Sequence, residues 1–217
     1  VLDANADGAI WVKKVEDPSA FGVVKLDDGY ISDFVEKPKE FVSDLAIIGI
    51  YYFKDGDRVK DQIQYLLDND LRENGEYQLT NVLETLKQEG AKFVPGTVDV
   101  WMDCGKKDPT VDTNKKILQI EQEKGNNLVS DTVILENAEI VQPCYIGEGV
   151  VIKDSKIGPY VSIGNHSSIN NSQITNSLIQ TNVEISNVQL DQAMIGNHAK
   201  YNGQYTSVSI GDYTELI

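Results

Sequence analysis

The stretch KIGPYVSIGNHSSIN, residues 156–170, decides how the second half of this chain folds. Isoleucine recurs in it every six residues, at Ile157, Ile163 and Ile169. A period of six does not fit a helix, but it fits a coil of three short strands, roughly 18 residues per turn, with one aliphatic side chain per face pointing inward. Each corner of such a coil needs a residue that accepts a positive φ angle, which glycine and asparagine do most easily. The pattern predicts an all-β, left-handed parallel β-helix of hexapeptide repeats.

The same texture extends over residues 132–217, where glycine repeatedly follows isoleucine and asparagine is abundant. The step is six from Ile146 to Ile152 but five from Ile169 to Ile174, so the number of coils stays open. An ordinary β-sandwich with Gly/Asn turns is the alternative. Sandwich strands alternate with period two and recur roughly every 8–12 residues, which this stretch does not do.

Residues 1–124 have a different pattern, in which strands alternate with helices. Phe21–Leu26 and Tyr30–Val35 flank Asp27-Asp28-Gly29, which predicts a hairpin. Leu45–Phe53 is a continuous apolar run, as expected of a strand buried on both faces. Three helices are predicted from apolar spacing: one carrying Val59, Ile63, Leu66 and Leu67, one carrying Leu79, Val82, Leu83 and Leu86 and stopping at Gly90, and one over Val111–Glu123. We therefore expect an α/β domain over 1–124, a linker over 125–131 and the β-helix over 132–217.

The bulk composition excludes some classes of partner. The net charge is -15, from 34 acidic and 19 basic residues, and basic residues cluster no further than in pairs. We expect no nucleic-acid partner and no anionic membrane surface, since both need a basic face. The sequence contains no run of about 18 apolar residues, so no membrane-spanning helix is predicted. Cys104 and Cys144, without CxxC spacing, suggest free thiols and a cytoplasmic protein. The chain opens on Val1, so we expect a longer protein.

Five motifs occur in a fixed order along the first half of the chain. They are Phe21-Gly22-Val23-Val24, Val35-Glu36-Lys37-Pro38, Ala46-Ile47-Ile48-Gly49-Ile50-Tyr51, Gly75-Glu76-Tyr77-Gln78-Leu79-Thr80-Asn81 and Trp101-Met102-Asp103-Cys104-Gly105. This set resembles the second half of the nucleotidyltransferases that activate hexose 1-phosphates, such as glucose-1-phosphate thymidylyltransferases. The tail resembles the C-terminal β-helix of their long-form members. The resemblance implies that 1–124 is the sugar-binding part of a Rossmann-like catalytic domain.

The resemblance also implies a reaction and its residues. A hexose 1-phosphate attacks the α-phosphorus of a nucleoside triphosphate, so two anions must be aligned and neutralised. Lys37 and Asp103 match the catalytic residues, the first contacting the sugar phosphate and the second binding Mg²⁺. The sugar-binding positions are Gly22, Glu36, Lys37, Gly49, Tyr51 and Glu76. Adjacent strand residues point to opposite faces, so Glu36 and Lys37 share a ligand only if the chain bends there, which Pro38 makes plausible. Otherwise Glu36-Lys37-Pro38 is a surface turn and Asp103 a capping or turn residue.

The sequence departs from the family pattern mildly at Cys104, where the family more often has threonine or valine, and more consequentially in two further places. Asn74 stands where some thymidylyltransferases have a phosphate-binding arginine, and Arg72 is a possible substitute. No Gly-x-Gly-x-Arg loop followed by a Pro-Lys segment occurs, although this loop holds the triphosphate in the family. We therefore expect activity only when the missing N-terminal half is present.

Two other functions stay open. β-helices also form acyltransferases, with a coil histidine as the base, and His166 and His198 are the candidates. Both lie in an Ile-Gly-Asn-His context typical of an exposed corner, so a structural or regulatory role for the β-helix fits better. A non-catalytic scaffold that binds sugar phosphate is the other alternative. The flat faces of a solenoid favour self-association, and we expect a homo-oligomer.

Overall fold

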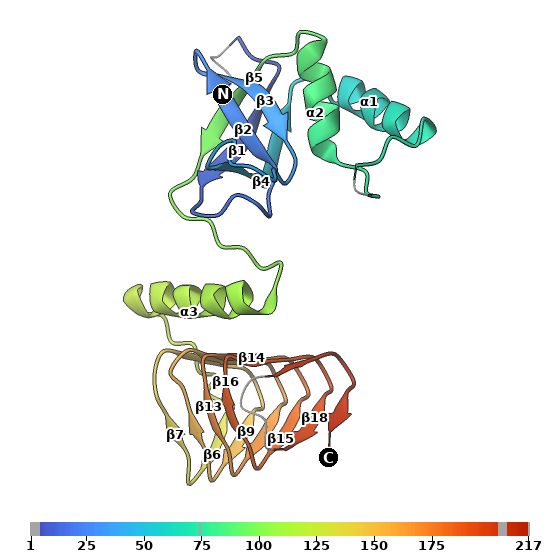
Figure 1. The fold of residues 1–217 in the computed structure, drawn as a ribbon. Coiled ribbons are helices and arrows are strands. Elements are labelled where there is room, and N and C mark those ends of the chain that lie inside the picture. Colours follow the sequence, from blue (N-terminus) through green and yellow to red (C-terminus); the bar gives the residue numbers. More distant parts are fainter. Residues whose placement is uncertain (1–4, 74, 204–207, 217) are drawn as a thin grey trace. The chain divides into compact units, whose positions relative to one another are not determined.

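The computed structural model describes residues 5–73, 75–203 and 208–216 (Figure 1). It divides into two compact units, Val1–Trp101 and Met102–Ile217, each with its own hydrophobic core. The linker predicted over residues 125–131 rests on a change in amino-acid composition, whereas the two units are defined by their internal contacts. As a domain boundary, this linker stays a prediction. None of the helices in the described ranges combines the length and apolar character needed to cross a bilayer.

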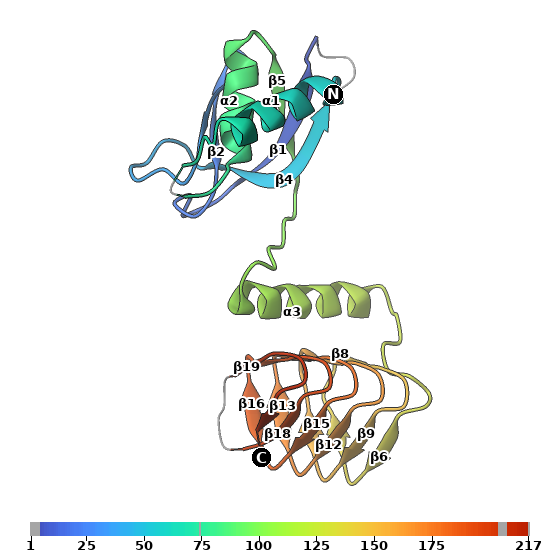
Figure 2. The ribbon, with the colours of Figure 1, turned by 90° about the vertical axis from the view of Figure 1, so that its right-hand side faces the viewer.

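The first unit is a five-stranded sheet with two helices (Figures 1 and 2). Its strands are β1 (Gly8–Lys14), β2 (Val23–Asp27), β3 (Tyr30–Val35), β4 (Leu45–Phe53) and β5 (Phe93–Thr97), arranged in the order β3-β2-β4-β1-β5. β1 runs antiparallel to β4 and parallel to β5, while β2 runs antiparallel to both of its neighbours. The predicted α/β layering is confirmed.

The β2–β3 hairpin forms as predicted. Its loop residues Asp28 and Gly29 both have positive φ angles, 46° and 82°. This is the backbone of a type I′ turn, whose twist matches that of the paired strands. At the open end of the hairpin, Val23 pairs with Val35. The residues just before Val23 and just after Val35 therefore lie close together.

Both helices of the first unit form where the apolar spacing predicts them. α1 (Gly56–Asp68) begins after Asp55, whose carboxylate accepts a hydrogen bond of 3.1 Å from the Arg58 N–H. α2 (Leu79–Gln88) ends before Gly90, which has a φ of +93° and is the predicted stop. α2 contacts both α1 and β3 (Figure 1). The two helices bury their apolar face against the sheet through Val59, Leu66, Val82, Leu83 and Leu86.

β4 corrects the prediction of a strand buried on both faces. Ala46 and Ile47 are buried, whereas Ile50 and Tyr52 are 48% and 39% exposed. Gly49, at φ +78°, lies within the strand where the pairing register with β1 shifts. Apolar character alone cannot tell a buried from an uncovered face, because that depends on which element packs there.

The second unit begins with α3 (Lys107–Glu123), which starts earlier than the predicted Val111. Its first turn contains Lys107, Asp108 and Pro109, which the apolar pattern does not mark, although proline is tolerated in a first turn. Val111 and Leu118 are buried.

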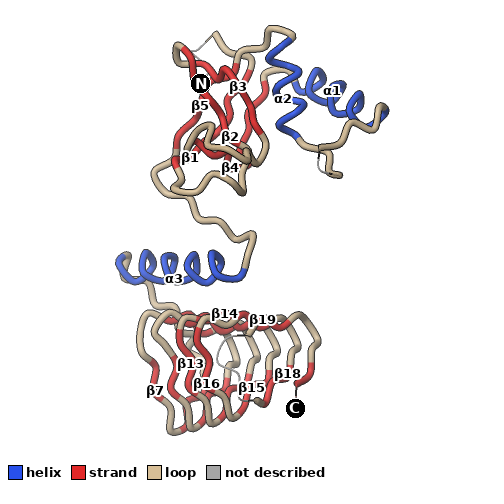
Figure 3. The backbone as a smooth tube through the Cα atoms, viewed as in Figure 1, coloured by secondary structure: helices blue, strands red, loops and turns tan. Residues whose placement is uncertain are grey.

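A solenoid of three parallel sheets follows, the predicted left-handed parallel β-helix (Figure 3). The first sheet contains β7 (Glu139–Ile140), β10 (Lys156–Ile157), β13 (Gln173–Thr175) and β16 (Gln189–Asp191). The second contains β8 (Cys144–Ile146), β11 (Val161–Ile163), β14 (Ser177–Ile179), β17 (Met194–Ile195) and β19 (Ser209–Ile210). The third contains β6 (Ile134–Glu136), β9 (Val151–Lys153), β12 (Ser168–Asn170), β15 (Glu184–Ser186), β18 (Lys200–Asn202) and β20 (Glu215–Leu216).

The coils are shorter than three full hexapeptides, and they shorten further along the chain. Glu139 pairs with Lys156 in the next coil, Gln173 pairs with Gln189, and Lys200 pairs with Glu215. The separation between partners falls by one position from each of these pairs to the next. From Ile152 to Leu190, the step from the third sheet to the first is five residues, as from Ile152 to Ile157. The step from the first sheet to the second falls from six residues, Ile157 to Ile163, to five, Ile174 to Ile179. A strict hexapeptide period therefore overestimates the coil.

The corners confirm the role predicted for asparagine, and they confirm it for glycine at Gly158, which follows Ile157 and has a φ of +100°. Asn171 and Asn187 have positive φ angles, 43° and 58°, and the Asn171 amide donates to Asn187 Oδ1 at 2.8 Å in the next coil. His166 and His198 also have positive φ angles and are exposed. Gly164, which follows an isoleucine, does not have positive φ; a Cβ there would lie 2.7 Å from the Gln180 backbone, so it is needed for close approach between coils.

α3 lies against the second sheet of the solenoid through polar as well as apolar contacts (Figure 2). The Asn114 amide nitrogen donates to the Tyr160 carbonyl at 3.3 Å, and its oxygen accepts from the Ser162 hydroxyl at 2.6 Å. The Lys115 ammonium lies 4.8 Å from the centre of the Tyr160 ring. The helix thereby covers one outer face of the coils.

Two adjacent serines allow a test of the polar interior of the solenoid. Ser167 is 1% exposed, and its hydroxyl donates to the Gln180 carbonyl at 3.0 Å and accepts from the Val183 N–H at 3.1 Å. Its neighbour Ser168 is exposed. We expect Ser167→Ala to lower the free energy of unfolding by ~1–3 kcal/mol in urea titrations, since a buried N–H and C=O lose their partner. Ser168→Ala should stay within about 0.5 kcal/mol of the unmodified protein. Equal effects of the two substitutions would contradict this account.

Candidate functional site

The candidate site forms where the chain leaves the open end of the β2–β3 hairpin. The Lys37 N–H donates to the Phe21 carbonyl at 3.1 Å, and the Ile47 N–H donates to the Gly22 carbonyl at 2.8 Å. These two bonds hold three segments of backbone together: the entry to β2, the exit from β3 and the start of β4. Glu36 and Gly22 are thereby brought side by side, as are the motifs to which they belong.

A bend at Lys37 places two consecutive charged side chains on the same side of the chain. β3 ends at Val35, and Lys37 has a φ of +39°, in the left-handed region. The Lys37 ammonium lies 3.8 Å from Glu36 Oε1 and 3.6 Å from Glu76 Oε2. The bend that Glu36 and Lys37 require for a common ligand is therefore present.

Glu36 is a largely buried carboxylate with a defined environment. Its side chain is 11% exposed, and Oε2 accepts a hydrogen bond of 2.9 Å from the Thr80 hydroxyl. Burial and, second, the negative charge of Glu36 raise the pKa of Tyr51 above its ordinary value, which places Tyr51 within electrostatic reach of that carboxylate. The Tyr51 ring stacks on Phe53 with 6.0 Å between centroids.

Gly22 is required by the carboxylate beside it. A Cβ at this position would lie 2.9 Å from Glu36 Oε2 and 2.9 Å from the Thr80 methyl group, closer than side chains normally approach. Phe21, the residue before it, packs edge-on against Trp101 with 5.5 Å between ring centroids. Glycine therefore keeps open the space in which Glu36 and Thr80 meet.

The rim of the site is exposed and carries both charges. The side chains of Lys37 and Glu76 are 47% and 67% exposed, and Gln78 donates to Glu76 Oε2 at 3.0 Å. Carboxylates accept hydrogen bonds from hydroxyl groups, and an ammonium group binds a phosphate. The arrangement is therefore suited to a ligand that carries hydroxyl groups together with an anionic group.

Two of the predicted site residues lie outside the contacts of this cluster. Gly49 is exposed on β4, and a Cβ added there would meet no atom within 4 Å. Asp103 belongs to the second unit, where its Oδ1 accepts from the Gly105 N–H at 3.0 Å and its carbonyl accepts from the Thr113 hydroxyl at 3.1 Å. Asp103 is thus held in a turn that leads into α3.

The possible phosphate contact at Arg72 does not gain support. Its guanidinium bonds Asp70 at 2.7 Å and the Tyr77 hydroxyl at 2.9 Å, and lies 4.2 Å from the centre of the Tyr77 ring. The guanidinium of Arg72 thus binds groups of its own loop. Asn74, where the family pattern is interrupted, lies outside the described residues.

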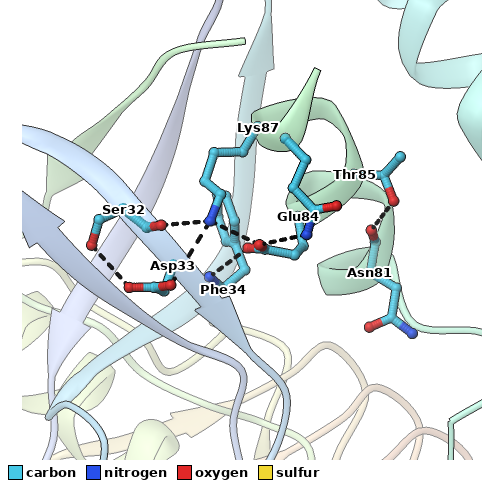
Figure 4. Close-up of polar contacts among 8 residues, drawn as sticks. Ser32, Asp33, Phe34, Asn81, Glu84, Thr85 and Lys87 are labelled. Atoms are coloured by element: carbon cyan, nitrogen blue, oxygen red, sulfur yellow. Dashed lines mark hydrogen bonds and ion pairs between the residues drawn. The ribbon is translucent and has the colours of Figure 1, made fainter. Parts of the chain in front are cut away.

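A row of polar contacts fixes α2 on β3 beside this cluster (Figure 4). The Lys87 ammonium donates to the Ser32 carbonyl at 2.6 Å, and Glu84 Oε2 accepts from the Phe34 N–H at 3.2 Å. Lys87 also pairs with Glu84 at 2.8 Å. The helix residues are spaced by about one turn, and their partners alternate along the strand. We call this row the α2–β3 seam; its pairs are Thr80 with Glu36, Glu84 with Phe34, and Lys87 with Ser32.

Sequence reasoning did not assign a role to Thr80. It lies in the Gly75–Asn81 motif, in the first turn of α2, and is 6% exposed. A threonine at the predicted helix start was the available signal. It could not be interpreted without knowing that Glu36, distant in the sequence, reaches the same place.

The solenoid carries a separate groove of about 740 Å³. Polar side chains along it are bonded to the neighbouring coil: Lys156 pairs with Glu139 at 3.1 Å, and Asn137 donates to Asp154 at 2.7 Å. These contacts are those expected of a structural surface.

The groups that could bind a metal are dispersed over the described parts of the chain. In the ranges that the structure describes, no three His, Cys, Asp or Glu side chains gather as a metal site. Asp103 offers one carboxylate, already orientated by the Gly105 N–H. A single carboxylate of this kind fits the hard oxygen chemistry of Mg²⁺, which retains several waters.

Comparison with known proteins gives one family. Residues 2–120 match the model of the family described as nucleotidyl transferase. The chain is 29% identical over 174 residues to a glucose-1-phosphate thymidylyltransferase of Streptomyces antibioticus, covering 74% of this chain and 48% of that protein. A second thymidylyltransferase, from Streptomyces griseus, is 25% identical over 213 residues, covering 91% and 58%. The mannose-1-phosphate guanylyltransferase catalytic subunit beta of Drosophila melanogaster is 31% identical over 145 residues, covering 66% and 37%. The chain spans about half the length of these curated relatives.

We expect Gly22→Ala to disturb the site itself. The added methyl group must displace Glu36 or Thr80, so the free energy of unfolding should fall by ~1–3 kcal/mol in urea titrations. Gly56→Ala is the matched control, because a Cβ at Gly56 meets no atom within 4 Å. A drop of the same size in both variants would show that Gly22 has no special packing role.

The seam should weaken in acid. Burial raises the pKa of Glu84, but hydrogen bonds from Lys87, Gln88 and the Phe34 N–H outweigh it and lower this pKa below its ordinary 4.5. Because the folded-state pKa is the lower one, the stabilisation is present above about pH 4.5 and is lost as pH falls through the folded-state pKa. The stability difference between the unmodified protein and Glu84→Gln should therefore shrink between pH 7 and pH 3 in urea titrations, whereas exposed Glu40→Gln should show little difference at any pH. A difference that stays constant with pH would contradict the assignment.

Proposed function

This chain belongs to the nucleotidyl transferase family, and from that premise we propose that the longer protein containing it transfers a nucleotidyl group from a nucleoside triphosphate to a hexose 1-phosphate. An oxygen of the sugar phosphate bonds to the α-phosphorus. The bond between that phosphorus and the oxygen bridging to the β-phosphate breaks, and pyrophosphate leaves with this electron pair. The products are a nucleoside diphosphate sugar and pyrophosphate. This agrees with the resemblance read from the five motifs, which the family match confirms.

The observation that carries the proposal is the bend that sets Glu36 and Lys37 on one side of the chain. A carboxylate for sugar hydroxyls and an ammonium for the phosphate are then 3.8 Å apart, the spacing of neighbouring groups on one small ligand. In the resting cluster Lys37 lies between Glu36 and Glu76. A bound phosphate replaces this partnership, and the ammonium then offsets repulsion between sugar phosphate and triphosphate.

The other proposed sugar contacts surround this pair. Glu36 and Glu76 accept hydrogen bonds from hydroxyl groups, and Gly22 leaves room for the Glu36 carboxylate. Tyr51 supplies a flat apolar side beside that carboxylate, which suits the face of a sugar ring. Gly49 stays in the proposed site on the strength of its motif.

We propose Mg²⁺ as the metal and Asp103 as one of its ligands. A divalent cation neutralises the charge that develops on the phosphates. Further oxygen ligands would come from the substrates, from water and from parts of the longer protein. A cytoplasmic location and a homo-oligomer, the latter suggested by the flat faces of the solenoid, are proposals of the same standing.

Pyrophosphate release by the longer protein tests the function. The panel combines the four ribonucleoside triphosphates and dTTP with glucose, mannose and N-acetylglucosamine 1-phosphates, with and without magnesium, and uses residues 1–217 alone as a control. The named relatives use different bases and sugars, so this panel must identify both. We expect turnover of a preferred pair that requires the metal, and no turnover by residues 1–217 alone.

Lys37→Ala should lower kcat/KM for that pair by about 100-fold, the usual effect of removing one charge-stabilising donor. Exposed Lys39→Ala removes the same charge two residues away and should have little effect. A folded protein without turnover of any pair would contradict the proposed function. Turnover that is unaffected by Lys37→Ala would remove Lys37 from the site.

A further inference from the structure

We propose that Thr80 is a positioning residue for the sugar-binding carboxylate: its hydroxyl fixes Glu36 in the orientation that accepts hydrogen bonds from the hexose. The inference rests on the proposed function above. It adds a residue whose effect on the substrate is exerted through Glu36, without contact with the reacting atoms.

The two oxygens of Glu36 have different neighbours. Oε2 accepts the hydrogen bond of 2.9 Å from Thr80, whereas Oε1 faces the Lys37 ammonium at 3.8 Å, a looser contact. A carboxylate has about four lone-pair positions, so this arrangement leaves acceptor capacity for a ligand. Thr80 thus anchors one side of the carboxylate, and the other side is directed to the exposed rim where Lys37 lies.

The anchor itself is rigid. Thr80 is 6% exposed, and as a β-branched residue in a helix it has few accessible χ1 rotamers. Its methyl group and the Glu36 carboxylate both pack against the position where Gly22 lacks a side chain. The hydroxyl therefore has little freedom to turn away from Glu36.

The α2–β3 seam brings Thr80 to this place before any ligand binds. Glu84 and Lys87 hold the next turns of α2 on the backbone of β3, and they do so through the Phe34 N–H and the Ser32 carbonyl (Figure 4). Strand and helix are thereby registered, so that the start of the helix meets the end of the strand at Glu36. A carboxylate fixed in advance does not lose side-chain freedom when the sugar binds, which strengthens binding.

The test is a steady-state comparison of variants of the longer protein with its preferred substrate pair. Thr80→Val keeps the shape and the methyl group of the side chain but replaces the hydroxyl with a second methyl group. We expect its KM for the hexose 1-phosphate to rise about tenfold, because a hydrogen bond to a charged group is lost, while its KM for the nucleoside triphosphate stays within about twofold. Thr80→Ser keeps the hydroxyl and should remain within about threefold of the unmodified protein.

Two further arms separate positioning from general structure. Thr85→Val removes a hydroxyl from the same helix, where it bonds the Asn81 carbonyl at 3.0 Å, and should leave both KM values unchanged. In a protein that already carries Glu36→Gln, Thr80→Val should raise the KM for the sugar phosphate by a smaller factor than it does in the unmodified protein. The reason is that the two residues act through one contact. Thermal melting of each variant shows whether it is folded.

The outcomes distinguish this inference from the function on which it rests. If the unmodified protein has no turnover, the proposed function fails. If the unmodified protein is active and Thr80→Val leaves the KM for sugar phosphate unchanged, the function stands and the positioning role is overturned. An equal rise in both KM values, or a loss that Thr80→Ser does not rescue, also overturns it, since either shows a general structural effect.

Discussion

The arrangement of the first unit depends on the α2–β3 seam. Three side chains on one face of α2 bond, in order, to alternate residues, two within β3 and one just beyond its end. Two of the partners are backbone groups of an edge strand, which have no strand beside them in the described part of the sheet. Satisfying them with Glu84 and Lys87 fixes the register of helix on strand. The position of Thr80 beside Glu36 follows from that register.

In the second unit, backbone pairing between coils fixes the register of each coil on the next. Buried serines and the asparagines at the corners add side-chain bonds to this ladder, as when the Ser172 N–H donates to the Ser155 hydroxyl at 3.0 Å. Described buried side-chain nitrogen and oxygen atoms all have partners. The interior is thus apolar on its faces and polar at its corners, where the buried serines Ser155, Ser167, Ser172 and Ser177 lie.

Sequence reasoning was reliable where a pattern is local. The hairpin at Asp28-Gly29, the helix stop at Gly90 and the inward isoleucines of the solenoid each depend on neighbours in the chain, and each is present. It was less reliable where the outcome depends on distant elements. The exposure of Ile50 on β4 depends on what covers the sheet, and the meeting of Thr80 with Glu36 depends on how α2 lies on β3. The early start of α3 was missed because its first turn is polar.

The stepwise shortening of the coils along the solenoid has a consequence for how such a chain can vary. In an ordinary sheet, the loss of one residue within a strand turns every later side chain to the opposite face. Here the coil after Ile169 lacks one residue at the corner between Ile174 and Ile179, and the next isoleucines still point inward, as Ile179 and Ile185 do. Deletions of single residues are therefore absorbed where they occur. The ancestry of such a domain can include many changes of length without a change of architecture.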